Sequence, residues 1–264
     1  MLIAPQNLCL FLALLALAAY WARLLTLGGA IAAATVGTTT VLLGGVPAVA
    51  LLFLFFFSSN LLGLYRKRAK QALGFEKGGR RDQWQVLANG GPALIGIAVL
   101  RFWPFHIIPQ HSCIAVFGAG LAEANADTWA TEIGSAVRGA TLSIVSGKPI
   151  RKGQSGGISA AGTAAAFCGA LLIASALGIL TSPHSSRLTV AAVTIAGFCG
   201  ALIDSILGAT LQAQFKSEDG TFTENSFAGV EAARGLNWFR NDAVNFCAGI
   251  SATAIAGLIL LHKS

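Results

Sequence analysis

Carboxylate side chains lie inside or beside stretches of sequence that are otherwise apolar. Glu123, Asp127 and Glu132 stand near the end of one such stretch. Asp204 lies within a second, and Asp242 opens a third. A carboxylate within or next to a membrane span is energetically costly, so it is functional by default. Because Mg²⁺ usually binds through one or two carboxylates plus substrate phosphates, these residues predict a metal-assisted phosphate site.

Two further segments have the residue types that bind phosphate. Arg80 and Arg81 follow two glycines and offer forked donors for phosphate oxygens, and Asp82 beside them is a candidate metal ligand. A Gly/Ser-rich segment, 148–163, leads directly into an apolar stretch, which suits a phosphate at a helix N-terminus. Its candidate residues are Arg151, Gly153, Ser155, Gly156 and Ser159.

Each of these segments also has a simpler interpretation. The basic run around Lys67 is equally typical of a loop held by anionic lipid head groups. The Gly/Ser segment contains no G-x-x-x-x-G-K-[ST] sequence, and a glycine-rich turn before a span is common.

Amide and hydroxyl side chains accompany the charged groups. Asp82, Gln85 and Asn89 have i, i+3 and i+7 spacing, so they share one face of a helix that enters the membrane. The other candidates that would orient phosphates are Asn125, Thr128, Asn241 and Asn245. All of these residues fall near one end of a predicted span, which favours one site at the membrane boundary.

The composition indicates which elements position these residues. Of the 264 residues 55% are hydrophobic and only 11% are charged, and the mean hydropathy is +0.69. A soluble domain carries about 25% charged residues, so we expect an all-α, polytopic transmembrane bundle forming a single domain over 1–264. Eight spans are predicted. They cover about 5–22, 24–44, 46–64, 86–103, 112–130, 157–180, 189–210 and 243–261.

Charge decides the expected orientation. The longer polar segments 65–85, 131–156 and 211–242, with Arg23, hold 15 of the 18 Lys and Arg residues. All 11 acidic residues fall on the same side or in the adjoining half of a span. By the positive-inside rule this side is cytoplasmic. We therefore expect an inner membrane, of plasma or thylakoid type, with the active site facing the cytoplasm and both termini outside.

Several motifs carry a family resemblance. They lie in order over about 24–262 and include Lys77–Asp82, Gln85–Gly91, Asn125–Gly134, Leu202–Gln212 and Asn241–Asn245. With these residues the chain resembles the integral membrane family of transmembrane protein 19, which includes the plant phytyl-phosphate kinase. One departure is that relatives have a Cys-containing segment after Gln212, whereas 213–225 contains no Cys.

The resemblance implies an isoprenoid (prenyl or phytyl) monophosphate kinase. Such an enzyme transfers a phosphoryl group from CTP or another nucleoside triphosphate to a lipid phosphate, with Mg²⁺ or Mn²⁺ as cofactor. On that basis Asp127, Asp204, Asp242 and Glu132 are the expected catalytic residues. The expected metal ligands are Asp82, Asp127, Asp204 and Asp242. The arginines, Lys67, the Gly/Ser segment and the amides would bind nucleotide phosphates.

Other functions fit the same residues. A transporter or flippase of an anionic lipid or small phosphate would also use buried acids and cations, although it needs polar groups through the full depth of its spans. A membrane scaffold is the third alternative. The expected partners are a lipid phosphate, a nucleotide and membrane lipid, with no nucleic acid. Small residues in the predicted sixth and seventh spans allow close helix packing within one chain or in an oligomer.

Overall fold

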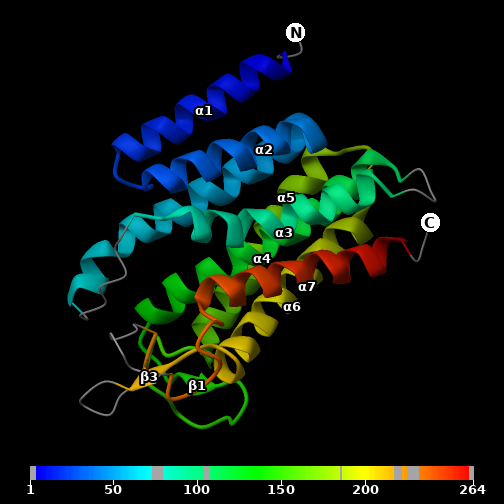
Figure 1. Cartoon of the computed structure of the whole chain (residues 1–264). Helices are drawn as coiled ribbons and strands as arrows, with labels where there is room; N and C mark the ends of the chain where they lie inside the picture. Colours follow the sequence, from blue (N-terminus) through cyan, green and yellow to red (C-terminus); the bar gives the residue numbers. More distant parts are fainter. Residues whose placement is uncertain are drawn as a thin grey trace.

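A computed structural model describes residues 4–72, 80–103, 108–184, 186–216, 222–224 and 232–261, for 64–72 and 261 by the backbone alone. Seven helices occupy most of the described residues (Figure 1). They are α1 (Pro5–Trp21), α2 (Leu27–Ala72), α3 (Gln83–Arg101), α4 (Gln110–Ala136), α5 (Ala160–Leu180), α6 (Arg187–Thr210) and α7 (Asn241–Leu261).

Polar residues mark the starts of three helices. The side chains of Asp82, Ser159 and Ser186 each accept a hydrogen bond from a backbone N–H in the first turn, at 3.0, 3.2 and 3.2 Å. These N-caps satisfy donors that have no partner within the helix. Asp82, expected to be a metal ligand, thus acts as the N-cap of α3.

Helix α2 is interrupted by one glycine. Gly45 has φ +63° and ψ −158°, a conformation that residues with a Cβ rarely adopt. Pro47 follows it, and Gly45 falls between the predicted spans 24–44 and 46–64. The chain reverses there, and the two arms of α2 return along each other (Figure 1).

Helix α4 is the centre of the bundle. It packs against α2, α3, α5, α6 and α7, and every residue of 113–126 is buried. A helix that is buried on all faces needs an apolar or small side chain at almost every position, and this stretch consists mainly of Ala, Gly and aliphatic residues. The buried exceptions are Glu123 and Asn125, so the core of the bundle contains two polar side chains.

Short strands and loops gather at one end of the bundle. Strand β1 (Leu142–Ser143) pairs antiparallel with β2 (Gly157–Ile158), and β3 (Phe215–Lys216) pairs antiparallel with β4 (Phe222–Thr223). β1 and β3 lie at the end of the bundle opposite both chain termini (Figure 1).

The helical bundle is confirmed, but eight spans are not supported. Among the described residues four helices are long and apolar enough to cross a membrane. They are Leu27–Gly63, Ala160–Leu180, Arg187–Thr210 and Asn241–Leu260. Helix α1 has only 17 residues, while α3 and α4 carry polar side chains such as Asn89, Glu123 and Asp127. The prediction counted apolar stretches without penalising these polar positions.

Asn125 joins three helices. Its Oδ1 accepts a hydrogen bond from Ser58 Oγ of α2 at 2.7 Å, and its Nδ2 donates to the carbonyl oxygen of Gly169 of α5 at 2.9 Å. The side chain is fully buried and does not line the polar cavity described below. Its placement is that of an interhelical link, whereas the sequence predicted a phosphate-binding residue.

We therefore predict that Asn125→Ala destabilises the bundle by about 1–3 kcal/mol, because it leaves buried polar groups on α2 and α5 without their partner. The measurement is the midpoint of thermal unfolding of the purified protein in detergent. Thr40→Val is the matched control, since the buried Thr40 hydroxyl bonds only to its own helix, at the carbonyl of Val36. An equal shift for both variants would contradict the interhelical role.

Candidate functional site

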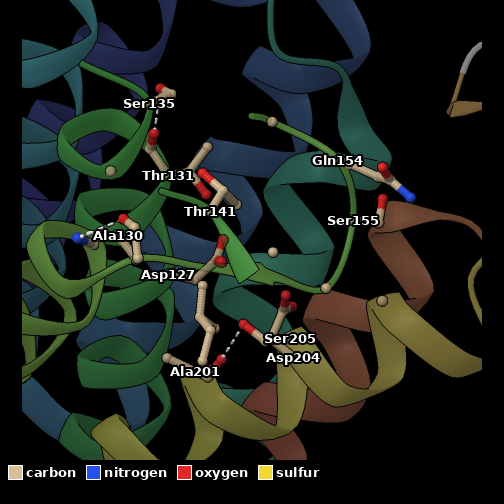
Figure 2. A pocket seen from close by; sticks show the side chains of 18 of the residues that line it. Asp127, Ala130, Thr131, Ser135, Thr141, Gln154, Ser155, Ala201, Asp204 and Ser205 are labelled. Atoms are coloured by element: carbon tan, nitrogen blue, oxygen red, sulfur yellow. Dashed lines mark hydrogen bonds between the residues drawn. The ribbon is translucent and has the colours of Figure 1, made fainter. Parts of the chain in front are cut away.

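A polar cavity lies where α4 and α6 end and α5 begins. Its volume is about 220 Å³, and the loop between β1 and α5 forms one wall (Figure 2). Polar and charged side chains from these elements, and from α7 and the segments beside α6 and β4, line it. They are Asp127, Thr131, Ser135, Thr141, Lys152, Gln154, Ser155, Ser159, Thr163, Asp204, Ser205, Gln212, Glu224 and Asn241.

Two carboxylates on different helices face this cavity. Asp127 is on α4 and Asp204 is on α6, and Figure 2 shows both side chains among the residues that line the same space. Asp204 also lies close enough to Glu224 for their charges to repel. Like charges at such short range favour a bound cation or proton, because either reduces the repulsion.

Glu123 lies behind these two carboxylates. Its side chain is 2% exposed, and its Oε1 has no hydrogen-bond partner in the described part of the chain. The charges of Asp127 and Asp204 act on it. It passes close to α6, where a methyl group on Gly200 would lie 2.5 Å from Glu123 Cγ. Glu123 was not among the expected catalytic or metal-binding residues, although its position within an apolar stretch was a signal for it.

The Gly/Ser segment wraps over the mouth of the cavity. Gly156 has φ +78°, and a Cβ there would lie 2.6 Å from the Cα of Ala209 on α6. Glycine at this position therefore lets the loop touch the helix. Ser155 Oγ donates to Glu224 Oε1 at 2.7 Å, and Lys152 Nζ donates to the carbonyl oxygen of Val137.

The N-terminus of α5 also borders the cavity. Ser159, the N-cap, lines it together with Gly162 and Thr163 of the first turn. The first N–H groups of a helix and its dipole attract anions. The cavity thus combines an acidic wall from α4 and α6 with an anion-attracting wall from α5, which is the combination that a metal-bound phosphate requires.

A chain of amides connects the acidic wall to α3. The Asn245 side chain of α7, with its NH₂ group turned toward acceptors, donates to Asp204 Oδ2 at 3.2 Å and to the carbonyl oxygen of Asn241 at 3.0 Å. Its other side meets the Asn89 amide at 3.2 Å. Asn89 and Asn245, predicted to orient phosphates, are thus placed beside a cavity-lining carboxylate.

Arg81 lies outside the lining of the polar cavity. Its backbone forms a bridge to Leu25, and its side chain lines an apolar cavity between α1, α2 and α3. Glu132 of α4 attracts it. Burial lowers the pKa of the Arg81 guanidinium, and the charge of Glu132 partly offsets this effect.

Four more of the predicted residues lie outside the lining of the polar cavity. Thr128 Oγ1 bonds to its own helix at Ala124, and the Arg80 guanidinium lies 5.9 Å from the centre of the Tyr20 ring. Arg151 is exposed in the loop, and Asp242 is on the first turn of α7. The Lys67 side chain is outside the described residues.

The expected four-carboxylate metal set is not gathered at one point. Within the described ranges no three His, Cys, Asp or Glu side chains are grouped so that they could hold one metal ion. Asp82 caps α3, while Asp127 and Asp204 share the polar cavity. Hydrophilic residues that the sequence motifs did not predict complete the lining, notably Thr131, Lys152 and Glu224.

Comparison with known proteins identifies the family. Residues 10–253 match the family described as "Integral membrane protein DUF92". The chain is 30% identical over 199 residues to "Protein PGR" of Arabidopsis thaliana, covering 68% of this chain and 69% of that protein. No solved structure matches the chain. The family includes the phytyl-phosphate kinase and the proteins like transmembrane protein 19, so the resemblance seen in the sequence motifs is confirmed. The chain belongs to the DUF92 family of integral membrane proteins.

Proposed function

We propose that the protein is an isoprenoid monophosphate kinase. It would transfer the terminal phosphoryl group of a nucleoside triphosphate to a prenyl or phytyl phosphate and form the diphosphate. The single observation that carries this proposal is the composition of the polar cavity. Two helices bring Asp127 and Asp204 to it, while the N-terminus of α5 and the Gly/Ser loop supply groups that attract phosphate.

The donor set of the cavity fits Mg²⁺ bound together with substrate phosphates. Asp127 and Asp204 are hard oxygen donors, and Mg²⁺ is usually held by one or two carboxylates plus phosphate oxygens. The ion, when bound, would neutralise phosphate charge that the acidic wall alone would repel. A bound Mg²⁺ would therefore let a cavity that contains two carboxylates accept an anionic nucleotide.

The proposed reaction needs positioning more than strong acid or base groups. An oxygen of the acceptor phosphate bonds to the γ-phosphorus of the nucleotide, and the bond from that phosphorus to the β–γ bridging oxygen breaks. The products are the lipid diphosphate and a nucleoside diphosphate. Since the acceptor phosphate is ionised near neutral pH, no group must remove a proton from it. Lys152 and the first turn of α5 would orient the nucleotide phosphates.

The distribution of Lys and Arg residues between the two ends of the bundle supports a cytoplasmic position for the site. The loops at the site end contain Arg138, Lys148 and Arg151, while Arg101 and Arg187 lie at the ends of helices on the opposite side. By the positive-inside rule the site end faces the cytoplasm of an inner membrane, with both termini outside. A nucleotide would then reach the cavity directly from solution.

The decisive measurement is phosphoryl transfer by the purified protein. We expect label from the γ-phosphate of CTP or ATP to appear in prenyl diphosphate when Mg²⁺ and a C15 or C20 prenyl phosphate are present. Chelation of the metal should abolish transfer, and added Mg²⁺ or Mn²⁺ should restore it. Absence of transfer with every nucleotide and prenyl phosphate would overturn the proposal. Flux of a phosphate compound into liposomes without transfer would indicate a transporter.

Asp127→Asn and Asp204→Asn should each lower kcat/KM about 100-fold or more, since each removes a charge that holds the metal and phosphates. Asp82→Asn is the matched control, because asparagine also caps helices well and Asp82 lies outside the cavity. Similar losses in all three variants would contradict the assignment of the site to the polar cavity. Thermal unfolding of each variant separates loss of activity from loss of structure.

The orientation is tested with a single cysteine at Lys148, an exposed loop residue at the site end. In a variant whose five native cysteines are replaced, K148C should react with a membrane-impermeant maleimide only after the cells are permeabilised. A single cysteine replacing exposed Arg187 at the opposite end should react in intact cells. The reverse labelling pattern would place the site outside.

A further inference from the structure

A second cavity shares no lining residue with the polar one and has a different composition. It has a volume of about 100 Å³ and lies between α1, both arms of α2 and the first turns of α3. Leu, Val, Ala and Phe side chains form most of its lining, with no Asp or Glu among the residues that line it. Such a cavity suits a hydrocarbon chain rather than a nucleotide.

One edge of this apolar cavity is polar. Arg81 lines it just before α3, and Gln85 and Asn89 line it from one face of the first turns of α3. Arg81 is half-buried, and its guanidinium is a fork-shaped donor suited to a phosphate. The cavity therefore pairs an apolar interior with a cationic edge, which is complementary to an anionic single-chain lipid.

The polar edge adjoins the proposed reaction site. Asn89 belongs to this edge and also meets Asn245, whose amide donates to Asp204 of the polar cavity. Glu132, which attracts Arg81, lies on α4 next to Thr131 of the polar cavity. A phosphate held beside Arg81 and Asn89 would thus lie between the apolar cavity and the carboxylates of α4 and α6.

The opposite side of the cavity reaches the outer surface of the bundle. Phe53 of α2 lines the cavity and is also 43% exposed. Leu14 and Leu17, on the part of α1 that borders it, are exposed as well. These apolar surfaces would contact lipid, so a chain in the bilayer could enter sideways without passing through water.

We propose that this apolar cavity holds the chain of the acceptor next to its phosphate, with Arg81 and Asn89 binding that phosphate. The assignment of the chain as an isoprenoid depends on the proposed kinase function. A cavity of about 150 Å³ accommodates a six-carbon ring. One of about 100 Å³ therefore holds roughly four or five carbons, which is one isoprene unit. The remaining units would continue past Phe53 into the lipid.

The test measures binding without catalysis. The full-length protein in detergent is titrated with geranylgeranyl monophosphate in the absence of nucleotide, and with geranylgeraniol, which lacks the phosphate. Arg81→Gln should weaken binding of the phosphate about 10- to 100-fold and leave binding of the alcohol nearly unchanged. A structural role of Arg81 alone would weaken both ligands equally, which would overturn the proposal.

A second variant tests the chain. Ala33 of α2 lines the cavity, so Ala33→Phe should fill it and weaken binding of both ligands about 10- to 100-fold. Ile31→Phe is the control, because Ile31 is on the same helix but 61% exposed and outside the cavity. Equal effects of the two variants, or none, would contradict the placement of the chain.

The outcomes separate this inference from the proposed function. Phosphoryl transfer with a KM for prenyl phosphate that is unchanged in Arg81→Gln and Ala33→Phe would leave the kinase proposal intact and overturn the chain site. Phosphate-selective binding that both variants weaken, in a protein that transfers no phosphoryl group, would support the chain site and overturn the kinase proposal. Phosphatidic acid, which has two chains, should compete poorly, and strong competition by it would contradict a single-chain site.

Discussion

Polar side chains at the centre of an apolar bundle require hydrogen-bond partners. In this protein the packing of neighbouring helices around α4 depends on providing such partners to its polar side chains. Asn125 is satisfied by Ser58 of α2 and the carbonyl of Gly169 of α5, which holds three helices together. Glu123 and Asp127 are acidic residues on the same helix, each two positions from Asn125. Because the link orients α4, it also decides where these carboxylates point.

Small residues make this arrangement sterically feasible. Much of α4 consists of Ala and Gly, so neighbouring helices approach it closely enough for side chains to bond across the interfaces. The same close approach at Gly156 lets the Gly/Ser loop rest on Ala209 of α6. Packing of small residues thus both builds the core and closes the polar cavity.

The two cavities have complementary chemistry and share one polar boundary. The larger cavity has carboxylates and a helix N-terminus, while the smaller one has hydrocarbon side chains and Arg81 at its edge. The amides of Asn89 and Asn245 connect them. A reaction between a water-soluble phosphate compound and a membrane lipid needs one polar and one apolar cavity. The phosphate compound arrives from water, and the lipid arrives from the bilayer.

Composition was enough to predict a helical membrane bundle, and the break between the predicted spans 24–44 and 46–64 falls at Gly45, because both features depend on local sequence. Eight spans are not supported, since four helices of the described ranges are long and apolar enough to cross a membrane. Helical spacing predicts which face of a helix carries Asp82, Asn125, Asp127 or Asp204. It does not predict which neighbouring helix each face contacts. Only tertiary packing decided that Asp127 and Asp204 share a cavity, that Asn125 links helices, and that Arg81 borders an apolar cavity. The physical reason is that these contacts join helices distant in the sequence, whereas the Asp82 cap of α3 is a local contact with Gln85.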